Sequence, residues 1–362
     1  MRLLRLELRN FRNHRDARAD LEGRPTLLLG ENGSGKTNWI EAAALLSIGR
    51  SFRGSRDREM VRRGADTFEV RAIVQGGAGS PRELTVRGSL RGPREVIVDG
   101  APVERLADLL GRFPTVHFSV EDLAVLNGEP AGRRRFLDVA LCQLEPAYVG
   151  ALRDYVAALR QRNRLLIESA RDGDPRNGEC AAWEDILARA GVDIDRRRAL
   201  LCDALGERLR ELAERVDPQL QPGFGYGVPA ATASERAAKL EELRPRDRRL
   251  GWTSIGPHRA RIECAIQGRE LTDGASRGYS RLYSILLRLA LAAVLDERLH
   301  EPPVVLLDDP ESELDPRWIG KLLGLLPEGS QTIVTACRPL TAAPARFCAM
   351  TIESLAMEGS AA

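Results

Sequence analysis

The amino-acid sequence predicts an α/β fold that is interrupted by a helical insertion. The apolar run 25–29 leads directly into a glycine-rich loop, and residues 35–47 after it have a helical pattern. The runs 304–308 and 332–336 are apolar and rich in β-branched residues, which is typical of strands buried in a parallel sheet. The stretch 119–216 between these parts is mainly helical in pattern. We therefore expect one sheet that is built from segments at both ends of the chain.

The N-terminal third contains further strand patterns. Residues 3–8 alternate between apolar and charged side chains, which is the period of a half-buried strand. Strand-like runs follow at 68–74, 83–87 and 94–98, with glycine-rich turns between them. Near the other end of the chain, residues 348–353 predict an additional edge strand.

The middle of the chain predicts a helical lobe. Ser119, with Asp122 three residues later, has the pattern of a helix N-cap before an apolar run. Apolar residues at helical spacing continue on both sides of the polar turn 171–179, and together they predict a short antiparallel helical hairpin. The segment 222–229 is rich in glycine and proline and is expected to end the helices.

These patterns divide the chain into three segments. Residues 1–118 are expected to form the N-terminal part of an α/β lobe I, and residues 290–362 its C-terminal part. Residues 119–289 are expected to form the helical lobe II with its hairpin. The hydrophobic content of 43% is enough for one large core or two moderate ones, so two lobes are compatible with it.

Composition excludes several classes of protein. No run approaches the roughly 20 apolar residues that a membrane-spanning helix needs, and the N-terminus lacks the apolar segment of a secretory signal. The six cysteines form no CxxC pair, so neither a zinc site nor a disulfide framework is expected. We predict a cytoplasmic protein without membrane association. The net charge of +2 does not by itself indicate a nucleic-acid partner.

The string GENGSGKT at 30–37 matches the P-loop pattern G-x-x-x-x-G-K-[ST] in full, between a strand and a helix. The glycines let backbone N–H groups face a phosphate, and the helix adds its positive N-terminal end. Lys36 is expected to neutralise the β- and γ-phosphates of ATP, and Thr37 to offer its hydroxyl to Mg²⁺. A chance match in an ordinary turn is the alternative, and the flanking elements argue against it. The residues expected to hold the nucleotide here are Gly30, Glu31, Asn32, Gly33, Ser34, Gly35, Lys36, Thr37 and Asn38.

A second acidic motif follows the apolar strand VVLLD. Strands that end in acids position the metal and its water in P-loop enzymes, so Asp308 is the candidate Mg²⁺ ligand and Asp309 the candidate general base. Glu311 is an alternative base that we rank below Asp309. An acidic turn after a strand is common, and only the P-loop gives this motif weight.

The spacing of the motifs selects the class of ATPase. Asp308 lies 271 residues beyond Thr37, whereas small GTPases and nucleotide kinases keep these elements much closer. ABC-class ATPases place a helical lobe between them and a Ser-x-Gly signature shortly before the acidic strand. Here Ser276, Arg277 and Gly278 open an apolar helical segment and are expected to contact a γ-phosphate. The string SELD at 312–315 has the position of the D-loop.

Five strings in order along the chain resemble the RecF family of bacterial recombination mediators, and the resemblance covers nearly the whole chain. The strings are LELRNFRNH at 6–14, VHFSVEDL at 116–123, RRRFLD at 133–138, GPHR at 256–259 and LLDDPESELD at 306–315. The resemblance implies an ABC-ATPase-like head that dimerises around two ATP molecules, with Ser276 and Gly278 completing the partner's site. It further implies roles in DNA replication, repair, recombination and the SOS response. These roles include binding gapped DNA with RecO and RecR, and loading the recombinase RecA onto strands coated with SSB.

The sequence also departs from the pattern of fast ABC ATPases. Tyr279 and Ser280 replace glutamines that are often seen in the signature, and Thr335 stands where many ABC ATPases place a switch histidine. Asp309 is one methylene shorter than the usual glutamate base. These departures lead to the hypothesis of a slow, DNA-dependent ATPase whose hydrolysis times release from DNA.

Arginine clusters are the candidate DNA contacts, because arginine suits phosphate binding. The preferred cluster is Arg53, Arg56, Arg58, Arg62 and Arg63. Other clusters lie at 133–135, 196–198 and 244–249, and for any one of them a solvated, salt-bridged surface is the simpler interpretation. The aromatic content of 5% argues against a base-stacking platform.

Three other classes of protein share parts of these patterns. A transporter ATPase subunit would fractionate with membranes, and we find neither a clear Q-loop nor a switch histidine. A chromosome-organising protein of the SMC type would carry far longer heptad repeats. An ATP-dependent nuclease would cut DNA with a metal, and the sequence shows no separate cluster of acids for one.

Overall fold

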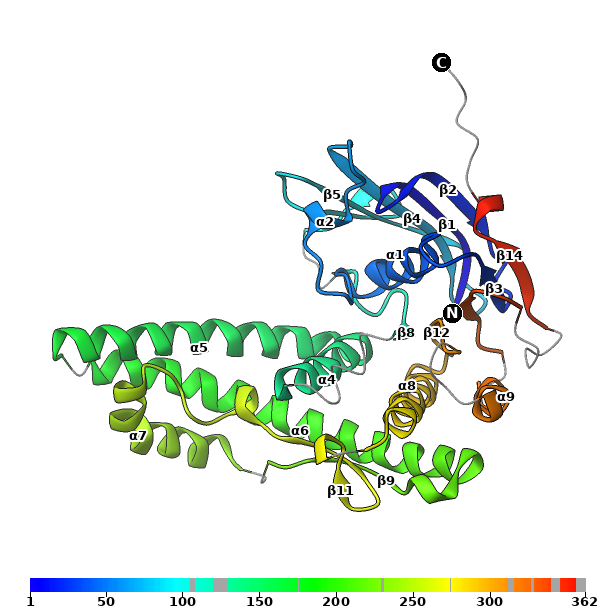
Figure 1. The fold of residues 1–362 in the computed structure, drawn as a ribbon. Coiled ribbons are helices and arrows are strands. Elements are labelled where there is room, and N and C mark those ends of the chain that lie inside the picture. Colours follow the sequence, from blue (N-terminus) through cyan, green and yellow to red (C-terminus); the bar gives the residue numbers. More distant parts are fainter. Residues whose placement is uncertain are drawn as a thin grey trace.

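A computed structural model describes residues 1–104, 108–119, 129–174, 176–228, 231–273, 275–311, 316–326, 329–339 and 346–355. Figure 1 shows an α/β body that holds the N-terminus and the last described residues, 346–355, and, beside it, a long helical lobe that projects away from it. The predicted D-loop and the second half of the string 116–123 lie outside the described residues.

The α/β body contains the predicted parallel sheet. Its strand order is β14-β3-β13-β12-β8, and every neighbouring pair is parallel. The strands are β3 (Thr26–Leu29), β8 (Thr115–Phe118), β12 (Val304–Asp308), β13 (Thr332–Ala336) and β14 (Cys348–Thr351). The expected edge strand is therefore confirmed as β14, whereas β8 was not predicted as a strand. All residues of β12 and β13 are buried, as their apolar runs require.

A second, antiparallel sheet has the order β2-β1-β4-β5-β6-β7. The strands predicted from alternation are confirmed, and β2 and β7 were missed. The bounds are β1 (Arg2–Phe11), β2 (His14–Asp20), β4 (Thr67–Gln75), β5 (Arg82–Ser89), β6 (Glu95–Val98) and β7 (Ala101–Pro102). One face of this sheet is buried, and the outer face carries cross-strand ion pairs such as Arg71 with Glu83.

Helix α1 (Lys36–Ile48) lies between the two sheets and shares one apolar core with both. Eleven of its thirteen residues are buried, so the helix is apolar around most of its circumference rather than on one stripe. This burial holds the N-terminal end of α1, and the loop before it, in a fixed place at the edge of the parallel sheet. The short α2 (Asp57–Met60) follows in the connection to β4.

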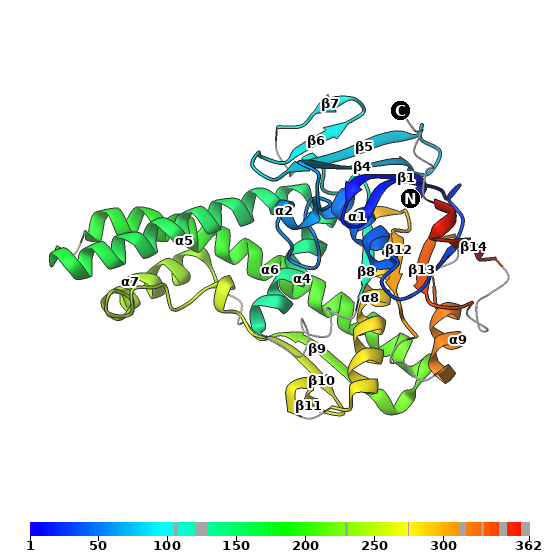
Figure 2. The ribbon, with the colours of Figure 1, turned by 45° about the horizontal axis from the view of Figure 1, so that its top comes forward.

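The helical lobe is built mainly from α4 (Pro130–Leu144), α5 (Pro146–Asp172), α6 (Asn177–Val216) and α7 (Ala233–Leu250). Helices α5 and α6 form the predicted antiparallel hairpin, and the 40 residues of α6 continue beneath the α/β body in Figures 1 and 2. The segment 222–229 is more than a helix breaker, because β9 (Pro222–Tyr226) pairs with β10 (Ile262–Ile266) in a small sheet. The sheet is completed by β11 (Arg269–Glu270), and this sheet and α7 were not predicted.

Helix α8 (Arg277–Leu299) joins the two lobes and packs against β8 and α6. It runs without a break across residue 289, so the predicted boundary there falls inside a helix. It is the one helix among the described residues that is long and apolar enough to cross a membrane, but 83% of the qualifying window is buried inside the protein. A core helix has the same composition. Helix α9 (Pro316–Gly324) and four 3-10 helices complete the described elements, namely η2 (Pro218–Leu220), η3 (Pro257–Arg259), η4 (Leu271–Asp273) and η5 (Glu353–Leu355).

A buried charge network joins the three long helices of the lobe. The Arg162 side chain on α5 is fully buried and donates to Glu184 on α6 at 3.0 Å and to Asp247 on α7 at 2.8 Å. Arg244 on α7 also donates to Glu184. Arg244 belongs to one of the clusters considered for DNA contacts, and the structure shows it instead as a buried partner of a carboxylate.

The string GPHR at 256–259 packs against α5 and α6 of this lobe. Gly256 has φ 125°, and a Cβ there would lie 2.4 Å from the Tyr155 hydroxyl, so only glycine fits. The Tyr155 hydroxyl donates to His258 Nδ1 at 2.6 Å, while His258 Nε2 donates to the Thr253 carbonyl at 3.0 Å. Burial lowers the pKa of His258, which favours this neutral form. Arg198 donates to the Pro257 carbonyl, so much of this resemblance motif has a structural explanation.

We expect Arg162→Met to destabilise the protein by about 3–5 kcal/mol, because it leaves the fully buried Asp247 carboxylate without its cation. Equilibrium unfolding in urea measures the change. Arg164→Met on the same helix is the control, since Arg164 pairs with Glu168 at an exposed site and its loss should leave the denaturation midpoint unchanged. Equal midpoints for Arg162→Met and the wild type would contradict the structural role of the network.

Candidate nucleotide-binding site

The predicted P-loop connects β3 to α1 at the carboxyl edge of the parallel sheet. Gly33 and Gly35 have φ of 84° and 103°, a region that other residues rarely adopt, and α1 begins at Lys36. The loop therefore has the glycine-dependent backbone that the motif predicts. Strand β13 lies between β3 and β12, so the acidic end of β12 reaches the same edge two strands away.

The turn between β1 and β2 supports the loop from outside. Asn13 Nδ2 donates to the Ser34 carbonyl at 2.9 Å, and Asn38 Nδ2 donates to Asn13 Oδ1 at 2.7 Å. His14 Nε2 lies 3.3 Å from the Gly35 carbonyl, and burial lowers the pKa of this histidine. A Cβ at Gly35 would meet Asn13 Oδ1 at 2.5 Å, so this glycine is required by close approach as well as by its φ. Sequence analysis gave this turn no role, although it lies within the string 6–14.

The Lys36 ammonium is almost fully buried in the loop. Its Nζ donates to the carbonyls of Gly30 at 2.5 Å and Glu31 at 2.7 Å, and it lies 3.6 Å from Cys337 Sγ. Cys337 follows β13 and donates to Asn32 Oδ1 at 2.9 Å. The cysteine is exposed, and it places a thiol within the ring of groups that surrounds the lysine. No sequence signal marked it.

A hydroxyl–carboxylate network joins the two ends of the chain. Thr37 Oγ1 donates to Asp308 Oδ1 at 3.1 Å, across 271 residues of sequence. Thr335 Oγ1 donates to the same carboxylate oxygen at 2.7 Å and accepts from the backbone N–H of Asp309 at 2.9 Å. Thr335 lies inside β13, opposite Asp308 in the register, rather than beyond the strand end as the comparison with a switch histidine assumed. Its role in orienting both acids was missed.

The donor set at this point suits a Mg²⁺ ion. A hydroxyl and a carboxylate supply the hard oxygen ligands that Mg²⁺ prefers, and this ion usually takes the rest of its shell from water and substrate phosphates. Among the described residues no group of three or more His, Cys, Asp or Glu side chains could hold a metal by itself. The residues present therefore fit a metal that binds together with a nucleotide.

Asp309 and Glu311 lie next to the network. Asp309 has φ 43°, a left-handed conformation that is uncommon outside glycine and turns the chain sharply after β12. Burial raises the pKa of Glu311; the charge of Arg338 opposes this increase, and the charge of Asp309 adds to it. Both carboxylates remain candidates for the general base.

The predicted signature lies at the start of α8. Ser276 is the N-cap residue, and its Oγ accepts from the Tyr279 N–H at 3.3 Å, a hydrogen bond within its own helix. Ser276 and Arg277 are exposed. A Cβ at Gly278 would lie 3.7 Å from the Trp318 ring, an ordinary contact, so the fold itself does not require glycine there. The structure thus brings the P-loop and the acidic strand together, and it leaves the signature as a separate exposed surface.

The preferred arginine cluster occupies the connection around α2. Arg53 lies 3.8 Å from the fully buried Glu41, which Arg12 also contacts, so part of its charge is balanced. The others are exposed or, for Arg62, half-buried. Of the alternative clusters, Arg134 donates to a backbone carbonyl and Arg198 is a buried partner of Asp138.

Comparisons with known proteins give a consistent result. Residues 2–354 match the RecF/RecN/SMC N terminal domain. The chain is 35% identical to the DNA replication and repair protein RecF of Cyanothece sp., over 92% of this chain and 91% of that protein. The identity with the RecF protein of Anaeromyxobacter sp. is 38%, over 90% of each chain.

Solved structures agree. The recombination mediator protein RecF with ATP, from the RecFOR pathway, has a TM-score of 0.86 and 28% identity, over 94% of this chain and 93% of that one. The Smc head domain of Pyrococcus furiosus, with a TM-score of 0.53, 16% identity and coverage of 93% and 90%, resembles the chain in fold alone. The predicted ABC-ATPase-like α/β head with a helical lobe is confirmed.

We expect alkylation of Cys337 by N-ethylmaleimide to weaken binding of a fluorescent ATP analogue by about tenfold or more, which corresponds to about 1.4 kcal/mol. The added group would occupy the space beside Lys36 and Asn32. Fluorescence titration measures the affinity, and mass spectrometry confirms the modified site. Cys337→Ser should bind normally and resist the reagent, whereas Cys348→Ser, which removes the other exposed cysteine, should remain sensitive. Unchanged affinity after complete modification of Cys337 would refute the placement of this thiol.

Proposed function

The chain belongs to the RecF family of DNA replication and repair proteins, an ABC/SMC-type ATPase family, and on this premise we propose that it is an ATP-dependent DNA-binding protein of recombinational repair. The observation that carries the proposal is the contact of Thr37 with Asp308, which assembles a complete P-loop and its acidic partner strand. A relative of the same fold is described as RecF with ATP, which supports ATP as the nucleotide.

The P-loop residues from Gly30 to Asn38 would hold the ATP phosphates. Lys36 rests on two carbonyls of its own loop, and the same ammonium can turn to the β- and γ-phosphates, which are stronger acceptors. The backbone N–H groups at the start of α1 add a positive helix end. Thr37 and Asp308 would hold Mg²⁺, which supplies charge neutralisation to the phosphates when it is bound.

Hydrolysis needs a group that orients and deprotonates water. Asp309 is our candidate base because the Thr335 hydroxyl fixes its backbone beside Asp308. The short side chain reaches less far than a glutamate, which favours slow, DNA-dependent hydrolysis that times release from DNA. Glu311 has a raised pKa, which makes it a better proton acceptor. It ranks second because it lies two residues farther from the strand end.

A second copy of the chain would complete the site. Ser276, Arg277 and Gly278 are exposed or half-buried at the start of α8, and the fold leaves room for a Cβ at Gly278. The absence of a side chain there is therefore best explained by something outside the chain that approaches closely. We assign this role to the ATP held by the partner subunit's P-loop, in an ATP-dependent homodimer.

The proposed biological role follows the family. A relative is described as a recombination mediator of the RecFOR pathway, which supports RecO and RecR as partners. The dimer would bind gapped DNA at junctions of single and double strands, in the cytoplasm, and help to load recombinase onto strands coated with SSB. The cluster Arg53, Arg56, Arg58, Arg62 and Arg63 would contribute phosphate contacts. We propose the division into lobe I (1–118 and 290–362) and lobe II (119–289) that the sequence predicts, with one change. The boundary at residue 289 falls inside α8, so we move it to one end of that helix, Arg277 or Leu299.

We expect ATP to double the molar mass of the protein in solution, because two exposed signatures would each bind the partner's nucleotide. Light scattering after size-exclusion chromatography, with ATP, with ADP and without nucleotide, measures this. Ser276→Arg should prevent the doubling and still bind ATP, since a large cation would fill the interface. If the molar mass is the same with and without nucleotide although ATP binds, the composite site and the assignment of the signature are excluded.

Steady-state hydrolysis in the presence of DNA should be slower than the roughly 10 per second typical of enzymes. Asp309→Asn should reduce the rate further, by about 10²–10⁴-fold, the usual effect of losing a general base. ATP-dependent dimerisation should persist in this variant. Glu311→Gln is the matched control, and loss of activity in this variant alone would transfer the base to Glu311. A wild-type rate of tens per second would exclude the timing role.

A further inference from the structure

The outer face of α5 carries a straight row of arginines. Arg153, Arg160, Arg164 and Arg171 are separated by seven, four and seven residues. At about 100° per residue these spacings place all four within about 40° of one another around the helix. All four residues are exposed, and the Arg153 and Arg164 side chains are 65% and 69% accessible. We call this row the α5 arginine row.

The α5 arginine row lies opposite the face by which α5 is packed. The buried residues Tyr155, Arg162 and Leu166 occupy the other side of the helix, about 180° away. The charge network of Arg162 holds that side against α6 and α7. The row is therefore displayed on a rigid support, and by helix geometry it is about 27 Å long.

The row carries an excess of positive charge. Arg153 pairs with Asp154 and Arg164 with Glu168, both at exposed sites. Among the described residues, no ion pair is formed by Arg160 or Arg171. The exposed face of the antiparallel sheet has no such excess of positive charge, because several of its arginines face acids on neighbouring strands. Those pairs are Arg5 with Asp20, Arg71 with Glu83, and Arg87 with Glu69.

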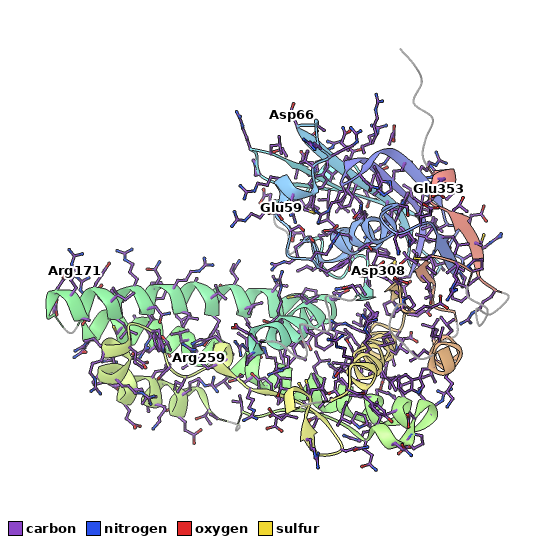
Figure 3. The ribbon with its side chains drawn as sticks, in the orientation of Figure 1. Glu59, Asp66, Arg171, Arg259, Asp308 and Glu353 are labelled. Atoms are coloured by element: carbon purple, nitrogen blue, oxygen red, sulfur yellow. The ribbon has the colours of Figure 1, made fainter. Side chains whose placement is uncertain are left out.

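The location of the row relates it to lobe I. Figure 3 shows Arg171 at the far end of α5, on the same side of that helix as Glu59 and Asp66 of lobe I. In Figures 1 and 2 the connection that carries α2 and the cluster 53–63 stands on the side of lobe I from which α5 extends. At the contact of lobe I with α4, a cavity of about 160 Å³ is lined by Arg50, which follows α1, and by Arg135 on α4. Cations are thus present at the end of lobe I that contacts α4, the helix that precedes α5.

We propose that the α5 arginine row is a backbone-binding surface for double-stranded DNA. The inference rests on the proposed DNA-binding function and deepens it by naming the element and the form of DNA. A straight, rigid row of about 27 Å matches about eight base pairs of duplex. No aromatic side chain belongs to the row, which disfavours the base stacking used for single strands. Protein interfaces need an apolar centre of several side chains. Beside this row Ile167 is exposed, but the row itself is cationic along its length, as DNA-binding surfaces are.

The test compares two double charge reversals with equal change in net charge. Arg160→Glu with Arg171→Glu removes the two arginines of the row that form no ion pair within the described part of the chain. Arg215→Glu with Arg269→Glu is the control, since both residues are exposed and lie at the end of α6 and on β11, away from the row. Anisotropy of a labelled 30-base-pair duplex, with ATP and at several salt concentrations, measures affinity. ATP binding and the melting temperature are measured for all proteins.

The expected result is a loss of duplex affinity of at least about tenfold in the row variant and less than twofold in the control. The slope of log affinity against log salt should fall by about two units, because each lost phosphate contact contributes about 0.9. ATP binding and melting temperature should match the wild type. Equal affinities of the row variant and the control would overturn the inference while DNA binding by the wild type stands. If the wild type binds no DNA under any of these conditions, the proposed function fails and the inference with it.

Discussion

The parallel pairing of β3 with β13, and of β13 with β12, is the constraint on which the candidate site depends. The P-loop and the acids of β12 come from opposite ends of the chain, and only this sheet brings Thr37 within hydrogen-bonding distance of Asp308. Thr335 on the central strand then bonds to one acid through its hydroxyl and to the backbone of the next. A shift in register of one residue would turn Thr335 to the other face and separate these groups.

Two other features also fix the positions of elements: the burial of α1 between two sheets and the ion pairs of the helical lobe. The first fixes the loop that would hold phosphates, and the second holds α5, α6 and α7 in one arrangement around Arg162. Buried ion pairs of this kind add little net stability but strongly disfavour arrangements that leave a charge unpaired. The helical lobe can therefore present the outer face of α5 as a rigid surface. A rigid surface can contact a charged polymer at several points at once.

Much of the site was accessible from the sequence because its chemistry is local. The glycines at 33 and 35 are needed for positive φ within the loop itself, and the apolar run of β12 predicts a buried strand ending at Asp308. Other parts were not accessible. The small sheet of β9 and β10 forms from segments separated by the whole of α7, and β9 alone resembled a helix-breaking loop. Arg244 looked like a surface cation until the fold placed it beside Glu184.

The sequence by itself determined the nucleotide-loop chemistry, the α/β class, the helical insertion and the family, since these follow from residue types, short spacings and the order of motifs. Only the tertiary structure decided which side chains meet. It placed Asn13 against Gly35, Cys337 beside Lys36 and Thr335 between two acids. It also showed that the arginines at 244, 198 and 162 are buried, whereas four other arginines of α5 form one exposed row. The physical reason is that contacts across a sheet or between helices depend on register and packing direction, which no short window of sequence contains.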